Sequence, residues 1–443
     1  MKCRVALGLF VCLGLLAAGC GLPAAGVPVH SEANRPQGEA APLTLGTGTA
    51  PSPVYLPFAA AGWTPPEARA YRYLCSVMDR YGSGRSLRLL ESYDDSAGFA
   101  DGDVAWVYDN AVAIVALLAS GSAEGISRAL LLGDALLYAQ AHDPEFADGR
   151  LRDAYRASAF VGRDGKVTVA EGGSATGNMA WAILALLGCY EASGDQRYLA
   201  GAERLADWLC AHTKDDTGLG GYVGGYSSAQ ARLTWKATEH NLDVYAALYR
   251  LYLATGEERW LNAATRARSF VESMWHEEGG HFWTGTLEDG RTLNPSPIPE
   301  DAQSWGVLVL GPRAGYSAAL DWALANLLEP RCSGCPEHTG MRFSDRGAGC
   351  WWEGLAHTAL ALDSVGRASE AEGFREALKA LQSQGVSGAL PAACPGGADT
   401  GFGWSYPSAP HVGATAWFLL ALQRHNPFWN QNVASPLPVA RER

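Results

Sequence analysis

The chain has 443 residues, a formal net charge of −12 and no cluster of lysines and arginines. Proteins that bind nucleic acids or anionic lipid surfaces usually carry basic patches, so the composition argues against both as partners. Hydrophobic residues make up 48% of the chain, which is enough to bury a large core.

The first segment has the features of an export signal. Lys2 and Arg4 precede a short apolar run, and small residues lead to Cys20. This run is too short for a permanent transmembrane helix. Residues 16–20 (LAAGC) resemble the bacterial lipobox, which implies a signal peptide over 1–19 and lipidation of Cys20. The protein is then expected to be exported and lipid-anchored to the bacterial cell envelope, with the outer membrane or periplasm as its location in a Gram-negative source. Ordinary cleavage near the same place is the alternative.

The rest of the chain divides by composition. Residues 20–62 are rich in Ala, Gly and Pro and are expected to form a flexible tether. Residues 63–430 are expected to form one large domain, and 431–443 a polar tail. The length would hold two ordinary domains, but a repeated helical pattern favours one.

Six segments predict helices that are apolar on nearly every side after a polar start. In 238–257 the polar start is Glu239, His240 and Asn241, and Thr238 is expected to cap the helix through its hydroxyl. The six segments are 106–121, 173–195, 238–257, 299–312, 350–366 and 411–426. Helices of this kind are buried all round.

A second set of segments alternates with the first and predicts amphipathic helices with one wet face. These segments are 66–81, 124–142, 196–213, 258–275, 317–328 and 369–384. The alternation predicts an inner ring of six buried helices covered by an outer ring of six. Short links such as 192–195 and 254–257 place all the polar helix starts at one end of the ring, which we call the mouth.

This all-α arrangement resembles the (α/α)6 toroid of six-hairpin glycosidases over about 66–428. The resemblance rests on architecture and loop composition, so it transfers no family residues. It implies an exported glycoside hydrolase that acts on an oligo- or polysaccharide, as a monomer and without a cofactor or metal. Membrane contact is expected only through the lipid anchor.

Glycoside hydrolysis needs two carboxyl groups that flank the scissile bond. Glu239 and Asp301 are the leading candidates, because each opens an apolar helix beside tryptophans. Asp109 and Glu353 are alternates in equivalent places. For each acid the simpler interpretation is a helix cap or a partner of the helix dipole. The sequence leaves open which of Glu300 and Asp301 points inward. It also leaves open whether hydrolysis retains or inverts the configuration at the anomeric carbon.

Other polar and aromatic residues near the helix starts would suit the polar rims and apolar faces of sugars. The expected substrate-binding residues are Trp106, Tyr108, Asn110, Asn178, Trp235, His240, Asn241, Gln303, Trp305, Trp351, Trp352, Trp404, Tyr406 and His411.

Two other kinds of function fit parts of the pattern. A carbohydrate-binding lipoprotein would keep the pocket without the chemistry. A sugar epimerase would use His240, His357 and His411 as proton carriers. A polysaccharide lyase would need basic residues at the mouth, where only Arg232 and Lys236 are close in sequence.

The cysteines predict disulfides, because export favours them. Cys332, Cys335, Cys350 and Cys394 fall in Gly- and Pro-rich sequence and form the expected disulfide pool, with open connectivity. A zinc site at these four is the alternative. Cys189 and Cys210 lie in helical patterns and are expected to be buried thiols. Asp215 and Asp216 are expected to lie in a solvated turn rather than a calcium loop.

Overall fold

The computed structural model of the protein describes residues 63–94, 103–311 and 315–432. The expected signal peptide, Cys20 and the tether lie outside these residues. So does the expected tail, except for Gln431 and Asn432.

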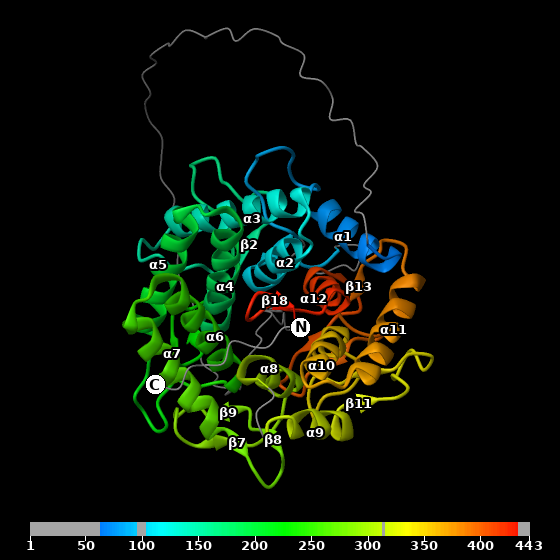
Figure 1. Cartoon of the computed structure of the whole chain (residues 1–443). Coiled ribbons are helices and arrows are strands. Elements are labelled where there is room, and N and C mark those ends of the chain that lie inside the picture. The colour runs from blue at the N-terminus through cyan, green and yellow to red at the C-terminus, as the bar shows by residue number, and fades with distance from the viewer. Residues whose placement is uncertain (1–62, 95–102, 312–314, 433–443) are drawn as a thin grey trace, which may run out of the picture. The chain divides into compact units, whose positions relative to one another are not determined.

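Twelve α-helices occur in the described residues and form two concentric rings (Figure 1). The inner helices are α2 (Val107–Ala119), α4 (Thr176–Ser193), α6 (Thr238–Thr255), α8 (Glu300–Leu310), α10 (Trp352–Ser364) and α12 (Val412–Gln423). The outer helices are α1 (Pro65–Met78), α3 (Ala123–Ala141), α5 (Gln196–His212), α7 (Glu258–Ser273), α9 (Ala318–Asn326) and α11 (Ala368–Gln384). The predicted alternation of inner and outer helices is confirmed, and the fold is an (α/α)6 toroid.

Burial separates the two kinds of helix. In α4 every residue from Thr176 to Cys189 is buried, whereas in the neighbouring outer helix α5 buried residues recur at helical spacing. Tight turns join the inner helices to the outer ones. Gly194 and Gly256 end α4 and α6 with φ of 72° and 73°, a left-handed conformation that glycine adopts without a Cβ clash.

The inner ring is closed. Each inner helix packs against the next, and α12 packs against both α2 and α1. The first and last helices of the described chain are therefore neighbours.

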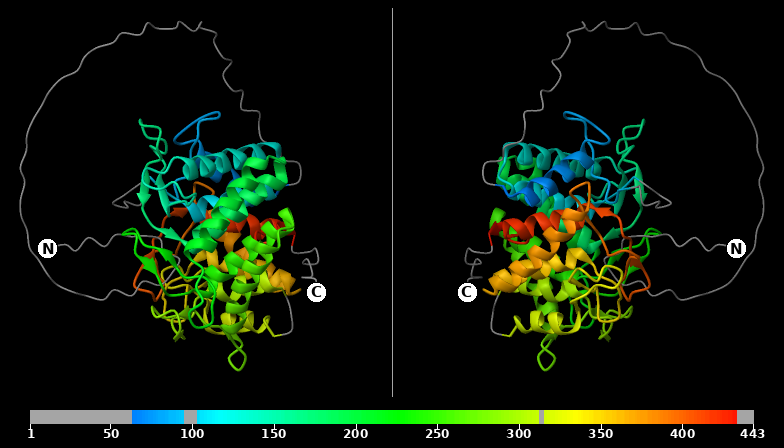
Figure 2. Two further views of the ribbon diagram at one scale, coloured as in Figure 1. Left: turned by 90° about the vertical axis from the view of Figure 1, so that its left-hand side faces the viewer. Right: turned by 90° about the vertical axis from the view of Figure 1, so that its right-hand side faces the viewer.

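Short antiparallel strands order the long loops, a feature that the all-α prediction did not include. The strands are β1 (Val104–Trp106), β2 (Ala154–Arg156), β3 (Val169–Glu171), β4 (Ser174–Ala175), β5 (Gly225–Tyr226), β6 (Arg232–Leu233), β7 (Trp275–His276), β8 (His281–Phe282), β9 (Gly285–Thr286), β10 (Leu293–Asn294), β11 (Leu328–Glu329), β12 (Gly340–Met341), β13 (Leu390–Pro391), β14 (Ala398–Asp399), β15 (Ser405–Tyr406), β16 (Pro410–His411), β17 (His425–Asn426) and β18 (Gln431–Asn432). They form sheets β1–β2–β3 and β4–β5–β6 and the pairs β7–β8, β9–β10, β11–β12, β13–β16, β14–β15 and β17–β18. Seen from the side, most of them lie at one end of the helices (Figure 2).

Large aromatic side chains fill the axis of the ring. Phe428, in the turn between β17 and β18, lies 5.1 Å from Trp181, 5.5 Å from Trp305 and 6.3 Å from Trp417, measured between ring centroids. Trp429 Nε1 donates to the carbonyl of Leu308 at 3.0 Å and so fastens this turn to the end of α8. We call Trp181, Trp305, Trp417 and Phe428 the aromatic plug. It fills the axis beginning about one helical turn from the mouth.

One expected cap is wrong. Helix α6 begins at Thr238, and its N-cap is Ala237. The Thr238 hydroxyl donates to the carbonyl of Trp283 at 2.5 Å. A loop carbonyl therefore takes the hydrogen bond that the sequence suggested would stay within the helix.

The disulfide prediction is confirmed for one pair, Cys332 and Cys350. Cys189 is a buried thiol as expected, and Cys210 is partly exposed. No group of three or more His, Cys, Asp or Glu within the described ranges is arranged to hold a metal ion. Asp215, in the turn considered for calcium, pairs with Lys236 at 2.9 Å.

None of the helices in the part of the chain that the structure describes has the length of apolar sequence that a bilayer crossing requires.

Candidate active site

The second and sixth residues of the inner helices meet on the axis of the ring. Residues four apart share one helix face, and contacts across the ring show that this face points inward. Tyr108 of α2, for example, bonds to Glu353 of α10, and Trp181 of α4 packs on Trp305 of α8. The second residues are Tyr108, Gly177, Glu239, Asp301, Glu353 and Gly413, and the sixth are Val112, Trp181, Asp243, Trp305, His357 and Trp417.

Acidic residues occupy one half of this axial layer. Glu239, Asp301 and Glu353 come from the successive helices α6, α8 and α10, and Asp243 lies one turn below Glu239. We call these four residues the acid arc. Each is no more than 5% exposed. The facing half of the layer carries Tyr108 and two glycines, so it contributes no charge.

Glu353 accepts one hydrogen bond from across the ring and has two histidines close by. The Tyr108 hydroxyl donates to Glu353 Oε1 at 2.6 Å, and Trp417 Nε1 donates to that hydroxyl at 2.8 Å. His357 Nε2 lies 3.6 Å from Oε1, and His411 Nδ1 lies 3.7 Å from Oε2.

The two histidines are linked to further acids. His357 Nδ1 faces Glu300 at 3.3 Å, and His411 Nε2 faces Asp109 at 3.3 Å. Burial lowers the pKa of His357, but hydrogen bonds to Glu300 and Glu353 raise that pKa by more. Burial likewise lowers the pKa of His411, and the negative charges of Asp109 and Glu353 outweigh it. His411 Nδ1 accepts from the backbone N–H of Ala414 at 3.1 Å, so this nitrogen has no proton to donate to Glu353.

The structure separates the roles of the adjacent acids Glu300 and Asp301. Glu300 accepts from the Thr358 hydroxyl at 2.7 Å and faces His357, so it is engaged with α10. Asp301 is 2% exposed and belongs to the axial layer. Burial and then the charge of Glu300 raise the pKa of Asp301 to about 7. Asp301 is thus a carboxyl group that can carry a proton near neutral pH.

Asp243 is a member of the acid arc that the sequence analysis missed. Its pKa is raised well above the ordinary range by burial and by the charges of Glu239 and Asp301. The i+4 spacing from Glu239 was the available signal, because it places both acids on one helix face. Glu239 Oε2 lies 3.7 Å from His240 Nε2.

Three amides expected at the substrate instead fasten loops to the inner helices. Asn241 accepts from the backbone N–H of Tyr222 at 2.8 Å and donates to the carbonyls of Tyr222 and Ala237. Asn110 makes the same three bonds with Leu90 and Trp106. Gln303 makes them with Phe282 and Pro299. We call Asn110, Asn241 and Gln303 the amide clamps. Each is the fourth residue of its helix.

Asn178 has a carboxylate partner that the sequence analysis also missed. Its Nδ2 donates to Asp153 Oδ1 at 2.7 Å, and the backbone N–H of Ala175 donates to the same oxygen. Burial raises the pKa of Asp153 to about 6 against these hydrogen bonds. Asp153 precedes β2 in a loop, where no helical pattern marked it.

The expected aromatic residues fall into separate groups. Trp351, Trp404 and Tyr406 pack together beside α10, with Trp351 stacked on Tyr406 at 5.5 Å. Trp305 belongs to the aromatic plug. Trp352 packs beside His338 in the disulfide-bearing loop, with ring centroids 6.1 Å apart. Two more rings lie close to inner-helix starts, Trp235 beside His240 and Trp106 at the N-cap of α2.

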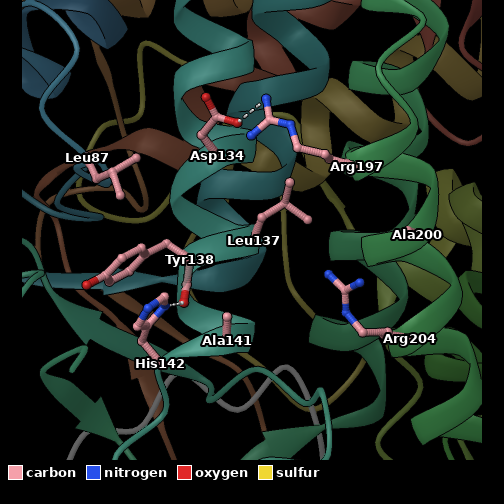
Figure 3. Close-up of a pocket in the computed structure, with 9 residues that line it drawn as sticks. All are labelled: Leu87, Asp134, Leu137, Tyr138, Ala141, His142, Arg197, Ala200 and Arg204. Atoms are coloured by element: carbon pink, nitrogen blue, oxygen red, sulfur yellow. Dashed lines mark hydrogen bonds and ion pairs between the residues drawn. The ribbon is translucent and has the colours of Figure 1, made fainter. Parts of the chain in front are cut away.

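A separate hollow of about 480 Å³ lies between the outer helices α3 and α5 (Figure 3). Its lining comprises Leu87, Asp134, Leu137, Tyr138, Ala141, His142, Arg197, Ala200 and Arg204. Its one carboxylate, Asp134, pairs with Arg197 at 3.3 Å. Because a pair of carboxyl groups is missing from this lining, the hollow is a weaker candidate for chemistry than the acid arc.

Comparison with known proteins confirms the fold. No family model matches the chain, and no curated protein matches it. Solved structures do. A glycosidase variant in complex with glucose has 15% identity and a TM-score of 0.57, with 80% of this chain and 95% of that chain covered. A D-mannose isomerase has 13% identity and a TM-score of 0.56 over the same shares. A family 76 glycoside hydrolase, a mannosidase from Bacteroides thetaiotaomicron, has 15% identity and a TM-score of 0.54 over 81% of this chain and 98% of that chain.

These likenesses extend over nearly the whole length of the matched structures but at low identity. They show the fold and do not distinguish hydrolysis from isomerisation. The chain has the (α/α)6 toroid fold of the six-hairpin glycosidase-like enzymes.

Proposed function

We propose that the protein is a glycoside hydrolase that cleaves an oligo- or polysaccharide at the acid arc. The observation that carries this proposal is the pairing of two unlike carboxyl groups on neighbouring inner helices. Asp301 has a pKa raised to about 7, whereas Glu353 is surrounded by Tyr108 and two histidines. Hydrolysis of a glycosidic bond needs one protonated and one ionised carboxyl group.

In this proposal Asp301 is the general acid and donates its proton to the glycosidic oxygen. Glu353 is the ionised partner and either activates a water molecule or attacks the sugar carbon itself. The negative charges of Glu300 and Glu353 beside Asp301 help it keep its proton. Glu239, a leading candidate from the sequence, stays a candidate for the second carboxyl group, and the experiment below includes it.

The electrostatics of the site favour a substrate without a carboxylate. In the described residues the ion-pair partners of Glu300, Glu353 and Asp109 are histidines. Arg232 and Lys236, the two basic residues considered for a lyase, are both paired with Asp215. A uronate substrate would therefore meet negative charge, and we propose a neutral sugar.

A reducing-end assay on soluble α- and β-glucans, mannans and envelope glycans tests the hydrolase. It compares the protein with Asp301→Asn, Glu353→Gln and Glu239→Gln, each checked by circular dichroism. Asp134→Asn, on outer helix α3, is the matched control. We expect new reducing ends from the parent and the control. We expect none above background from Asp301→Asn or Glu353→Gln, and the response of Glu239→Gln decides its role.

The other outcomes would select the alternatives. The histidines beside Glu353 and the isomerase among the similar structures make an epimerase or isomerase the second candidate. Deuterium entering a free sugar from D₂O, with no new reducing ends, would select it. Binding of a glycan that raises the thermal midpoint, with neither reaction, would indicate a carbohydrate-binding protein.

We propose further that the protein is exported and anchored by a lipid on Cys20, and that it is a monomer. The support is the sequence of residues 1–20 and the Ala-, Gly- and Pro-rich stretch that follows. Membrane fractionation of the parent and Cys20→Ala tests the anchor, since only the parent should sediment with membranes. Analytical ultracentrifugation of the soluble variant tests the monomer.

A further inference from the structure

Four cysteines lie in two loops near the start of α10. The loop that precedes α10 holds Cys332, Cys335 and Cys350, and the loop that follows α11 holds Cys394. Cys332 and Cys350 form the disulfide described above. Cys335 and Cys394 are thiols that are 5% and 1% exposed. Cys335 N donates to the carbonyl of Cys332 at 3.2 Å, so the short turn 332–335 brings the second thiol back beside the disulfide.

Backbone contacts fix Cys394 in the same place. Cys394 N donates to the carbonyl of Cys350 at 3.0 Å, and Cys350 N lies 3.2 Å from Cys394 Sγ. The two loops also touch on the side of Cys335. A Cβ on Gly334 would lie 2.5 Å from the carbonyl oxygen of Pro395, which is closer than side chains approach. Burial raises the pKa of the Cys335 thiol to about 11, and the neighbouring Cys394 thiol adds to this rise.

We infer that Cys335 and Cys394 form a second disulfide, parallel to the one between Cys332 and Cys350. The bond forms by exchange with a small-molecule disulfide such as oxidised glutathione. A thiolate of the pair attacks that disulfide, which forms a mixed disulfide and releases one glutathione thiolate. The second protein thiolate then attacks the protein sulfur of the mixed disulfide and releases the other glutathione thiolate. The two protein thiols lose two protons and two electrons, and the external disulfide leaves as two thiols.

The two bonds would together bracket the start of α10. Cys350 lies three residues before Glu353, and Ala393, beside Cys394, forms a β-bridge with Trp351. The first disulfide holds together the loop that precedes α10. The second would tie the loop that follows α11 to the turn 332–335 of that first loop. Residues 335 and 394 are far apart in sequence, so the bond closes a long loop of the unfolded chain and stabilises the folded protein.

Peptide mapping of the full chain, oxidised with glutathione disulfide, tests this inference. The protein is denatured with N-ethylmaleimide and digested with trypsin without reduction. Trypsin releases Cys332 and Cys335 in one peptide (332–342), Cys350 in a second (347–367) and Cys394 in a third (380–424). We expect one species of three joined peptides in the parent. In Cys335→Ser we expect peptide 380–424 to be free, with 332–342 still joined to 347–367.

Thermal unfolding gives an independent readout. In the oxidised state, Cys335→Ser and Cys394→Ser should each have a lower thermal midpoint than the parent. When the variants and the parent are all reduced, the difference in thermal midpoint should disappear. Cys189→Ser, at a buried thiol outside the cluster, is the control for loss of a thiol alone. Peptide 380–424 alkylated at Cys394 in the oxidised parent would overturn the inference. A tightly bound zinc ion, one per chain, would also overturn the inference if all four cysteines became open to alkylation only after a chelator removed the zinc.

Discussion

The environment of Asp301 is unlike that of an ordinary surface acid. It is buried on the axis beside Glu300, and these two causes raise its pKa to about 7. A general acid must be protonated before it can act. The rate of hydrolysis should therefore fall as the pH rises through about 7, and a pH–rate profile with a neutral glycan measures it. A rate that stays level between pH 6 and 9 would contradict the role of Asp301.

The same shift predicts how stability depends on pH. An unfolded aspartate has a pKa of about 3.9, so the folded protein holds the Asp301 proton more tightly. This contribution is fully present below pH 4 and is lost as the pH rises through about 7. Asp301→Asn keeps the shape without the charge, so it should flatten the pH dependence of the free energy of unfolding in that window. Urea unfolding at pH 4.5, 6 and 8 measures the change.

In the proposed reaction Tyr108 acts through Glu353. Its hydroxyl bonds Glu353 and receives the indole N–H of Trp417. Tyr108→Phe removes one hydrogen bond from the carboxylate, so kcat should fall about tenfold with KM little changed. Steady-state kinetics on the best glycan of the panel measures both constants. A change confined to KM would instead place Tyr108 in substrate binding.

At the scale of the helices and loops, the same set of hydrogen bonds recurs where inner helices meet their neighbouring loops. The amide clamps pair with a loop backbone in both directions and also with the carbonyl four residues earlier. Thr415, the fourth residue of α12, takes a similar place by accepting from Leu390 N at 2.9 Å. The loops that carry the mouth are thus tied to the helices that carry the acid arc.

The clamps can be tested singly. Asn241→Ala leaves the N–H and carbonyl of Tyr222 without these partners in a buried place, so it should lower the free energy of unfolding by roughly 2–4 kcal/mol. Asn326→Ala is the control, because Asn326 bonds only the carbonyl of Trp322 at an exposed site. Urea unfolding of both variants gives the comparison. Equal losses would mean that the clamp has no special role.

The helices were predictable from sequence, whereas the clamps were not. Apolar periodicity and tight glycine turns located all twelve helices to within a few residues, because burial depends on the residues of each helix itself. The partners of Asn241 and Gln303 come from distant loops, so sequence could show only that these amides are buried. The i+4 spacing could have placed Asp243 on the same helix face as Glu239, but sequence could not show that this face meets Asp301 and Glu353.

At the scale of the whole ring, the aromatic plug fills the axis that the six inner helices surround. Phe428 joins rings from α4, α8 and α12, which would otherwise surround a void. Phe428→Ala should therefore cost about 3–5 kcal/mol of unfolding free energy. Leu253→Ala, at a side chain that is 56% exposed on α6, is the control for loss of an exposed side chain. Chemical denaturation measures both, and a loss below 1 kcal/mol for Phe428→Ala would show that the plug packs loosely.

The direct packing of α1 against α12 has a consequence for how the chain could be rearranged. Because the helix pairs form a closed ring, no pair is structurally the first. The packing of the ring therefore does not depend on which pair contains the N-terminus. A gene rearranged to begin after the glycine turn at Gly194, with a short linker from residue 432 to residue 63, should still yield a folded toroid. Each of the tight inner–outer turns would then be a usable point at which to open the circle.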